Sequence, residues 1–227
     1  MSDSPHITID VVSDVMCPWC YIGKRRLEQA LAMTDGVTTD VRWRPFQLDA
    51  TLPKEGRDRK DYLETKFGGP EKAKEIYGRI EEAGRLEGLE FNFSDIAVSP
   101  NTLDAHRLIR WAANEGEEVQ NKLVEALFRR FFMEGAHIGR DDVLVEIAEE
   151  AGMDGSIVAA LLATDKDKAE TDNEIRTAQS MGVTGVPCFI IDNKYAVMGA
   201  QEPEHIAQAI IQAAEMKKAG APGRSAD

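Results

Sequence analysis

The amino-acid sequence predicts a mixed α/β protein in which two segments of strands and helices flank a long block of helices. The first segment has the pattern strand, helix, strand, and the last has helix, strand, strand, helix, whereas the region between them shows only helical periodicity. The chain of 227 residues is long enough to bury a sizeable core without disulfide bonds. We therefore expect an α/β domain of residues 1–48 and 166–219, an inserted helical domain of residues 49–165, and a disordered tail at residues 220–227.

The N-terminal segment contains the first strand, helix and strand. Residues 7–12 are β-branched and largely alternate, which is typical of a strand. Residues 21–33 are rich in Lys, Arg, Leu, Glu and Ala, which favour a helix, and Asp35-Gly36 ends it. Apolar and charged residues alternate over residues 37–46, which predicts a second strand. A right-handed crossover through the helix would make the two strands parallel.

The middle of the chain, residues 49–165, predicts about six helices and no strand, because apolar residues recur there at three- and four-residue spacing. Pro70 suits the first turn of a helix, where its missing N–H costs nothing. Asn101 and Asp141 are candidate N-caps. The apolar stripes are expected to face the core.

The C-terminal segment begins with a helix over residues 168–181, which Gly182 ends. Residues 188–191 form an apolar run, and a polar turn connects them to residues 195–198, which predicts a β-hairpin. A last helix starts at Pro203.

The charge balance argues against nucleic-acid and membrane partners. Lys plus Arg number 27 against 40 Asp plus Glu, so the net charge is -13, whereas phosphate backbones and anionic lipids attract clustered cations. No Lys or Arg precedes Lys24, which does not fit a secretory leader. The apolar run at residues 157–163, among the longest in the chain, is far too short to span a membrane. We expect a cytoplasmic protein.

The motif Cys17-Pro18-Trp19-Cys20 lies between the first strand and the first helix. Pro18 favours a first-turn position, which puts Cys17 at the helix N-terminus, where the helix dipole favours a thiolate. Cys20 follows one turn later on the same face, so the two sulfurs can form a disulfide. A thiolate attacks a partner disulfide and a second thiol resolves the mixed disulfide, and this spacing supplies both groups.

The same two thiols could be half of a zinc site. Such a site usually has four ligands from two closely spaced pairs. The sequence has no second Cys-x-x-Cys, and its histidines show no His-x-x-x-His spacing: His6, His106, His137 and His205. We therefore favour redox chemistry and expect no metal.

A second motif, Gly185-Val186-Pro187, directly precedes the apolar run of the hairpin. Proline is disfavoured within a buried strand because it cannot donate a hydrogen bond to the ladder. A cis Val186–Pro187 bond would avoid this problem and turn the backbone toward a neighbouring loop, although an ordinary trans turn proline is the alternative.

Three stretches together resemble the DsbA-like thioredoxin-fold family, and in particular its FrnE-type branch. These are the segments at residues 17–24, 101–108 and 182–187, which include Cys-Pro-Trp-Cys, Ala-His-Arg-Leu and Gly-Val-Pro. The resemblance extends from about residue 7 to residue 216. It implies a thioredoxin fold interrupted by a large all-helical insertion, and disulfide exchange with protein or small-thiol substrates.

The resemblance also implies roles for individual residues. Cys17 would be the nucleophile, Cys20 the resolving thiol and Pro187 a cis-proline opposite them. Val186 would offer backbone groups to an extended substrate segment, and Trp19 and Pro187 would also contact the substrate. The sequence differs from periplasmic members of the family in two ways. Those members carry a leader, and the two residues between their cysteines often include a histidine, whereas Trp19 adds no positive charge there.

Several other polar residues lie near the motif. Asp14 is either a strand-end or capping carboxylate or a proton acceptor for Cys20 through water, and we favour the structural role. His106 is expected in the core or a groove, and Cys188 as a buried small hydrophobe, with a third thiol near the site as the alternative. The cations that follow the motif are expected on a solvated helix face: Lys24, Arg25 and Arg26.

Two functions compete with disulfide exchange. Relatives such as 2-hydroxychromene-2-carboxylate isomerase and the kappa-class transferases activate glutathione, usually with a serine where Cys17 stands. Glutathione would then be a co-substrate; no other cofactor is expected. A polypeptide-binding holdase that uses the groove between sheet and helical cap is the third hypothesis. The oligomeric state is left open.

We predict an intermediate reduction potential for the Cys17–Cys20 pair. Helix N–H groups alone support the Cys17 thiolate, so its pKa should lie below the free value of about 8.5 but well above the lower extreme of about 3.5. Equilibration with glutathione buffers followed by quenched alkylation measures the potential. A strongly oxidising value, as in periplasmic DsbA, would contradict the prediction.

Overall fold

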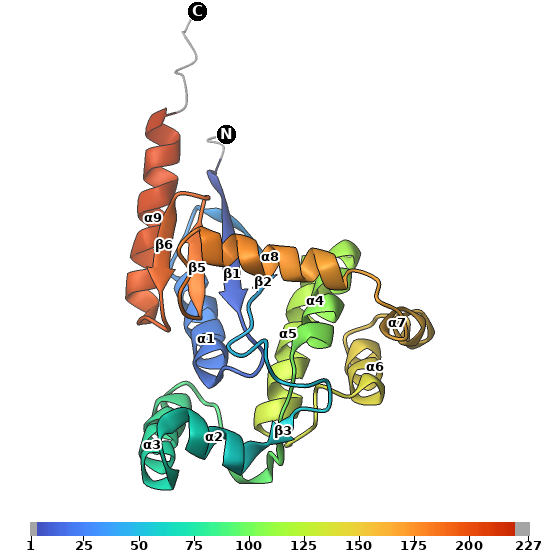
Figure 1. The fold of residues 1–227 in the computed structure, drawn as a ribbon. Helices are drawn as coiled ribbons and strands as arrows, with labels where there is room; N and C mark the ends of the chain where they lie inside the picture. The colour runs from blue at the N-terminus through green and yellow to red at the C-terminus, as the bar shows by residue number, and fades with distance from the viewer. Residues whose placement is uncertain (1–3, 221–227) are drawn as a thin grey trace, which may run out of the picture.

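A four-stranded sheet forms the framework of the protein, as Figure 1 shows in a computed structural model that describes residues 4–220. Its strands are β1 (His6–Ser13), β2 (Thr38–Pro45), β5 (Cys188–Ile191) and β6 (Tyr195–Met198), in the order β2-β1-β5-β6. β1 is parallel to β2 and antiparallel to β5, which is antiparallel to β6. The predicted parallel pair and the predicted hairpin are both confirmed.

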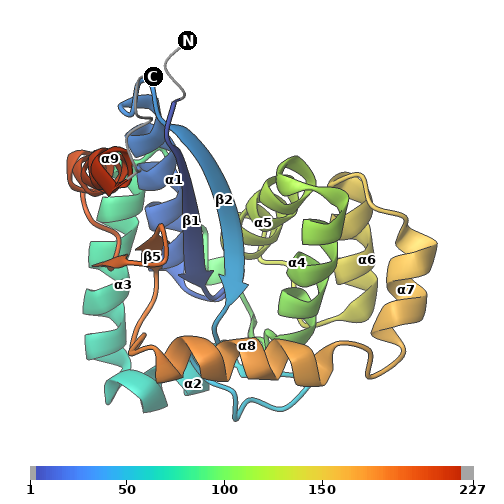
Figure 2. The ribbon, with the colours of Figure 1, turned by 90° about the horizontal axis from the view of Figure 1, so that it is seen from above.

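Helices cover both faces of this sheet. α1 (Pro18–Ala32) and α9 (Pro203–Gly220) pack together on one face, and α8 (Lys168–Ser180) lies on the other, as Figure 2 shows. The alternation in β1 explains these layers, because successive side chains of a strand point to opposite faces. Ile9 and Val11 join the main core with α1 and α9, whereas Val12 packs with Ala178 of α8.

Six α-helices separate β2 from α8, as the periodicity predicts. They are α2 (Arg59–Phe67), α3 (Pro70–Leu86), α4 (Leu103–Glu115), α5 (Glu117–Phe132), α6 (Asp141–Glu150) and α7 (Gly155–Leu162), with a single 3-10 turn, η1 (Phe93–Asp95). The sheet with its flanking helices and this insertion form the thioredoxin fold with a helical insertion that the sequence predicts.

The expectation of no strand in the insertion is wrong. β3 (Arg57–Asp58) and β4 (Val98–Ser99) pair antiparallel. Two-residue strands have no alternation that a sequence pattern can detect. Gly56 makes the pairing possible, because a Cβ there would lie 2.6 Å from the Ser99 carbonyl oxygen, and its φ of +77° favours glycine.

Details at helix ends differ from the sequence-based expectations. Asn101 is not the N-cap of α4, because Thr102 holds that position, but the Asn101 Oδ1 atom accepts a hydrogen bond of 3.0 Å from the N–H of the first helical residue, Leu103. Asp141 is not an N-cap, because Arg140 is the extended residue before α6. Residue 220, assigned to the disordered tail, ends α9, and residues 221–227 lie outside the described residues.

Aromatic packing connects the insertion to the sheet layer. Tyr21 of α1 stacks on Phe128 of α5 with ring centroids 4.9 Å apart, and Phe132 stacks alongside. α5 also covers the exposed edge of β2, where Gln120 accepts a 3.1 Å hydrogen bond from the Trp43 N–H and donates one of 3.4 Å to the Trp43 carbonyl. Because an unpaired sheet edge invites aggregation, this contact also protects the sheet.

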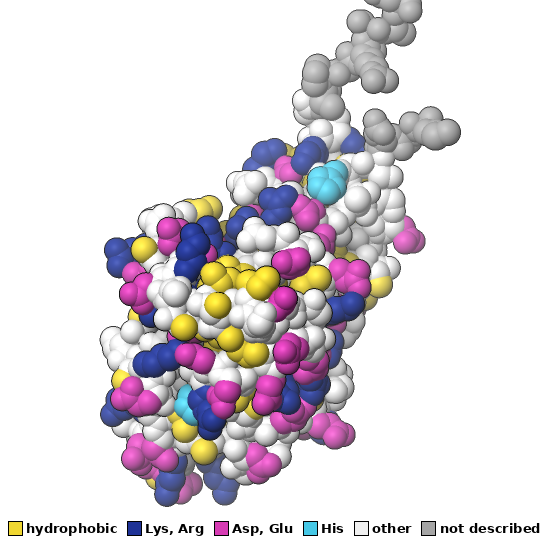
Figure 3. Space-filling view, turned by 90° about the vertical axis from the view of Figure 1, so that its right-hand side faces the viewer, with side chains coloured by type: hydrophobic (Ala, Val, Ile, Leu, Met, Phe, Trp, Pro, Cys, Tyr) yellow, Lys and Arg dark blue, Asp and Glu magenta, His cyan; other side chains and the backbone are white. Residues whose placement is uncertain are grey.

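No helix among residues 4–220 is long and apolar enough to cross a membrane. On the face of the helical side shown in Figure 3, lysines and arginines alternate with acidic side chains around a central group of hydrophobic ones. This face therefore offers no continuous basic stripe.

Arg107 is a fully buried cation that connects α4 to the segment between α7 and α8. Its guanidinium donates hydrogen bonds of 2.7 to 2.9 Å to the Asp104 carboxylate and to three backbone carbonyls, those of Leu161, Thr164 and Lys166. The Ala-His-Arg-Leu motif thus contains a structural arginine.

We predict that Arg107→Met lowers the free energy of unfolding by about 3 kcal/mol, because it leaves buried acceptors unpaired. Arg110 on the same helix is the matched control, since it is partly exposed and pairs with Glu174. Arg110→Met should cost at most about 1 kcal/mol. Urea denaturation measures both values, and equal losses would contradict the assignment.

Candidate active site

Cys17 and Cys20 lie where β1 leads into α1. Cys17 is the N-cap of α1, with Pro18 as the first helical residue, as predicted. The Cys17 N–H donates to the Asp14 carbonyl and the Cys20 N–H to the Cys17 carbonyl, both over 3.0 Å, which holds the turn. Both are free cysteines in this structure, and they lie one helical turn apart.

The Val186–Pro187 peptide bond is cis, as the sequence analysis favours. The Cys17 thiol lies 3.8 Å from the Val186 carbonyl oxygen, with the geometry of a weak S–H donor. The structure therefore brings together two motifs that are 169 residues apart in the chain. Val186 is half-buried and Pro187 is buried.

Gly23 is a site residue that the sequence analysis missed. A Cβ atom at Gly23 would lie 2.8 Å from Cγ of Pro187 and 3.3 Å from the Phe189 ring, closer than a side chain tolerates. Glycine in a helix interior costs about 1 kcal/mol relative to alanine, so its presence needs a packing reason. The glycine inside the predicted first helix was the available signal.

A thiolate that attacks a partner disulfide is expected to lie open to solvent, but the structure buries Cys17, so that expectation is wrong for the protein without a partner. Cys17 is 5% exposed, because the Val186–Pro187 loop lies against the first turn of α1. Trp19 is 38% exposed and is the accessible member of the motif. Trp19 and the half-buried Val186 are therefore more accessible than the Cys17 sulfur itself.

Cys20 is the deeper thiol, at 1% exposure. Burial raises the pKa of the Cys20 thiol well above its ordinary value, and the neighbouring Cys17 sulfur raises it further. The Ser13 hydroxyl and the backbone of Asp14 act in the opposite direction. Cys20 is therefore held protonated at neutral pH, as a thiol that reacts second would be.

Asp14 is completely buried and holds two loops together. Its Oδ2 atom accepts a 2.7 Å hydrogen bond from the Leu48 N–H, and Oδ1 accepts one of 3.3 Å from the Met16 N–H. The Nε2 atom of His106 lies 3.4 Å from Oδ1 without hydrogen-bond geometry. These contacts agree with a structural carboxylate at the end of β1, which does not cap α1, and with the expected core position of His106.

The cations after the motif are not on a solvated face, so that prediction is wrong. Lys24 is 2% exposed and pairs with Glu28 and with Glu125 of α5. Arg26 is also buried and donates to Glu87 over 2.7 Å. Carboxylates from other elements meet these cations, which the sequence alone cannot show.

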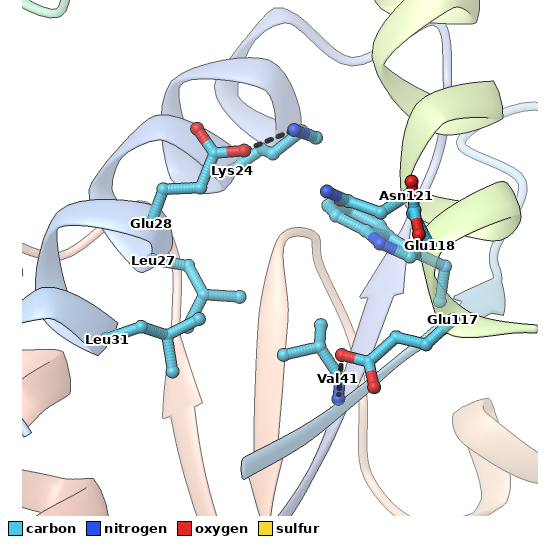
Figure 4. Close-up of a pocket in the computed structure, with 9 residues that line it drawn as sticks. Lys24, Leu27, Glu28, Leu31, Val41, Glu117, Glu118 and Asn121 are labelled. Atoms are coloured by element: carbon cyan, nitrogen blue, oxygen red, sulfur yellow. Dashed lines mark hydrogen bonds and ion pairs between the residues drawn. The ribbon is translucent and has the colours of Figure 1, made fainter. Parts of the chain in front are cut away.

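Figure 4 shows the pocket of about 410 Å³ beside Lys24. Lys24 and Glu28 reach into it from α1, and Asn121 and Glu118 from α5. The Glu117 carboxylate accepts a 3.0 Å hydrogen bond from the Val41 N–H on the β2 edge. The pocket thus lies on the side of α1 that faces α5, and Cys17 and Cys20 are not among its lining residues.

Cys188 is buried at the start of β5, where it packs with Val12 and Phe46. Burial raises the pKa of the Cys188 thiol. It therefore behaves as the small hydrophobe that the sequence analysis expects. Residues 4–220 contain no group of three or more His, Cys, Asp or Glu side chains that could hold a metal ion.

The sheet, the helical insertion and a Cys-x-x-Cys opposite a cis-proline define a thioredoxin-fold protein with a dithiol. The family model of the DSBA-like thioredoxin domain matches residues 8–211. The chain therefore belongs to the DsbA-like thioredoxin-fold family, as its resemblance implies.

Two similar proteins cover most of the chain. A probable DsbA oxidoreductase from Streptomyces coelicolor is 33% identical, with a TM-score of 0.86 over 98% of this chain and 94% of that one. An uncharacterized protein of Bacillus subtilis, YwbO, is 30% identical over 82% of this chain and 86% of its own length.

Two more distant structures share the fold. A 2-hydroxychromene-2-carboxylate isomerase is 17% identical with a TM-score of 0.67, over 95% of this chain and all of its own. The cytosolic disulfide reductase DsbM of Pseudomonas aeruginosa, with GSH, is 16% identical with a TM-score of 0.60, over 93% and 98% of the two chains.

We predict that Ser13→Ala raises the pKa of Cys20. The Ser13 hydroxyl is buried, has no nitrogen or oxygen partner among the described residues and favours the Cys20 thiolate. The ultraviolet absorbance of the thiolate, followed against pH in a Cys17→Ser, Cys188→Ala background, reports this pKa. Ser99→Ala is the control, because the Ser99 hydroxyl is equally buried and unpartnered but lies on β4. An unchanged Cys20 pKa in Ser13→Ala would contradict the prediction.

Proposed function

We propose that the protein is a thiol–disulfide oxidoreductase that uses Cys17 as nucleophile and Cys20 as resolving thiol. The observation that carries the proposal is the Cys17 thiol at the start of α1, 3.8 Å from the carbonyl oxygen that precedes the cis Val186–Pro187 bond. Family membership gives the coarser conclusion, a DsbA-like thiol oxidoreductase. Within the family, the motifs at residues 17–24, 101–108 and 182–187 favour the FrnE-type branch.

The exchange proceeds in two balanced steps. The Cys17 thiolate attacks one sulfur of the substrate disulfide, forms a mixed disulfide and releases the other substrate sulfur as a thiolate. Cys20 loses its proton and attacks the Cys17 sulfur, which releases the second substrate thiol. The substrate gains two electrons and the protein acquires the Cys17–Cys20 disulfide, which an external thiol such as glutathione then reduces.

The two sulfurs are suited to different steps. Cys17 stands at the positive end of the helix dipole, which stabilises a leaving or attacking thiolate. The burial that raises the pKa of Cys20 keeps this thiol protonated, so it does not compete with Cys17 for the substrate disulfide. Cys20 reacts only after the mixed disulfide has formed on Cys17, one helical turn away. Glutathione as a small-thiol partner and a cytoplasmic location belong to this proposal; the likeness to a cytosolic disulfide reductase with GSH supports both.

A substrate would bind beside the sulfur in an extended conformation. The Val186 carbonyl already accepts from Cys17, and Pro187 holds it against α1. An incoming segment would pair with the Val186 backbone and pack on the exposed Trp19 ring.

A glutathione-dependent isomerase is the second candidate, because the fold matches such an isomerase with a TM-score of 0.67. In that reaction Cys20 has no step, whereas disulfide exchange needs both thiols. The effect of removing each cysteine therefore separates the two functions.

We predict that Cys17→Ser abolishes insulin disulfide reduction, because no nucleophile remains at the start of α1. Cys20→Ser should instead accumulate a mixed disulfide with the substrate, detectable by mass spectrometry, because nothing resolves it. Cys188→Ser is the matched control and should retain the rate. Glutathione-dependent isomerisation that survives Cys20→Ser, without insulin reduction by the wild type, would favour the second candidate.

A further inference from the structure

A second pocket, of about 340 Å³, lies in the helical insertion. α2, α3 and η1 form its walls, and Figure 1 shows α2 and α3 below the end of α1 at which Cys17 stands. α1 and α3 contact each other. The polar and aromatic side chains that line the pocket include those of Arg59, Lys60, Lys74, Tyr77 and Phe93.

Arg59 at the back of this pocket is a buried cation without a counter-ion. It is 4% exposed, its Nη2 atom has no hydrogen-bond partner, and its side chain forms no ion pair within residues 4–220. Buried charges in proteins are normally paired, because an unpaired one is costly. Burial accordingly lowers the pKa of Arg59, which the nearby Tyr77 phenol opposes.

Aromatic rings hold the guanidinium in place. Its central carbon lies 5.2 Å from the centroid of Tyr77, 5.8 Å from that of Phe93 and 5.7 Å from that of Phe131. Such cation–π contacts fix the orientation of the planar group without pairing its charge, and its Nη2 atom keeps an unused donor. The arginine is thus preorganised to receive an acceptor.

The lining has a positive charge that contrasts with the whole chain. Arg59, Lys60 and Lys74 contribute three cations and no Asp or Glu lines the pocket, although the chain has a net charge of -13. Lys60 and Lys74 are exposed and form no ion pair with a described residue. A concave surface with charges of one sign concentrates ligands of the opposite sign.

The pocket also lies within electrostatic reach of the dithiol. Burial raises the pKa of Tyr77, and the negative charge of the Cys17 sulfur contributes in the same direction. Tyr77 lines the pocket and its ring lies against the Arg59 guanidinium, so one ring is shared by the pocket and by the electrostatic surroundings of Cys17.

We propose that this pocket binds a carboxylate of a small disulfide or thiol substrate, with Arg59 as its main ligand, while the sulfur of that substrate meets Cys17. This inference rests on the proposed function and names its substrate class. A guanidinium presents paired N–H donors that match a planar carboxylate, and Lys60 and Lys74 attract the anion at the rim. Tyr77 and Phe93 contact the apolar part of the ligand. The pocket selects small disulfides that carry an acid group over neutral ones.

The kinetic test compares Arg59→Gln with wild type on oxidised glutathione and on its fully esterified form. Because Arg59→Gln removes a charged hydrogen bond, it should lower kcat/KM for oxidised glutathione by about tenfold. The kcat/KM for the esterified form should stay within about twofold of the wild-type value. Arg59→Lys should recover part of the preference for the acid over the ester, because lysine keeps the positive charge but lacks the paired N–H donors of a guanidinium. The control is Arg79→Gln, an exposed arginine of α3 that pairs with Glu75, and it should change neither rate.

A binding test does not depend on catalysis. In a Cys17→Ser, Cys20→Ser background, calorimetry with S-methylglutathione should show binding that Arg59→Gln weakens about tenfold, and its ester should bind equally weakly to both. Thermal unfolding checks that Arg59→Gln is folded.

Three results would overturn the inference. Equal losses on acid and ester would mean that Arg59 has a structural role only, and no loss on either would mean that the pocket does not hold the carboxylate. Slower insulin reduction with unchanged glutathione kinetics would assign the pocket to acidic protein segments. The proposed function fails separately, if wild type exchanges neither insulin nor oxidised glutathione, and the calorimetric comparison still tests the pocket in that case.

Discussion

The close approach of the Val186–Pro187 loop to the first turn of α1 is the contact on which the candidate site depends. It brings a carbonyl oxygen to 3.8 Å from the Cys17 thiol and covers that sulfur. Gly23 permits the contact, because any side chain there would collide with Pro187. The loop can hold this position because β5, which follows it directly, pairs with β1, which leads into Cys17. The central strands of the sheet therefore determine the distance between the two motifs.

The helical insertion contributes side chains that pair with and pack against the elements around the candidate site. α5 contributes Glu125 to Lys24, closes the β2 edge through Gln120, and stacks Phe128 on Tyr21. The cations that follow the Cys-Pro-Trp-Cys motif are consequently neutralised by carboxylates, and they add little positive potential at the thiols. The dipole of α1 is then the main support for a thiolate at Cys17, and the intermediate reduction potential of the pair stays a prediction.

The same insertion gives the surroundings of the dithiol an uneven charge. α2 and α3 carry the unpaired Arg59 and two free lysines close to the N-terminus of α1. On the other side of α1, toward α5, the cations are paired with glutamates. Among residues 4–220 of a chain that is acidic as a whole, α2 and α3 thus form a positive concavity, and the proposed selection of acid-carrying substrates rests on this asymmetry.

The four strands of the main sheet, the number of helices and the position of Cys17 at the start of α1 followed from the sequence, because each depends on local periodicity or on the backbone restrictions of proline. The cis bond at Pro187 followed only from the family resemblance, since the residues alone left the trans form open. The β3–β4 pair, the need for glycine at position 23 and the pairing of Lys24 and Arg26 could not be predicted in this way. They depend on contacts between segments far apart in the chain: Arg57 with Ser99, Gly23 with Pro187, Lys24 with Glu125. The sequence by itself determined which residues can do redox chemistry. Only the tertiary structure decided how deeply the sulfurs are buried and which charges stay unpaired, because burial and charge compensation are properties of packed surfaces and not of neighbouring residues.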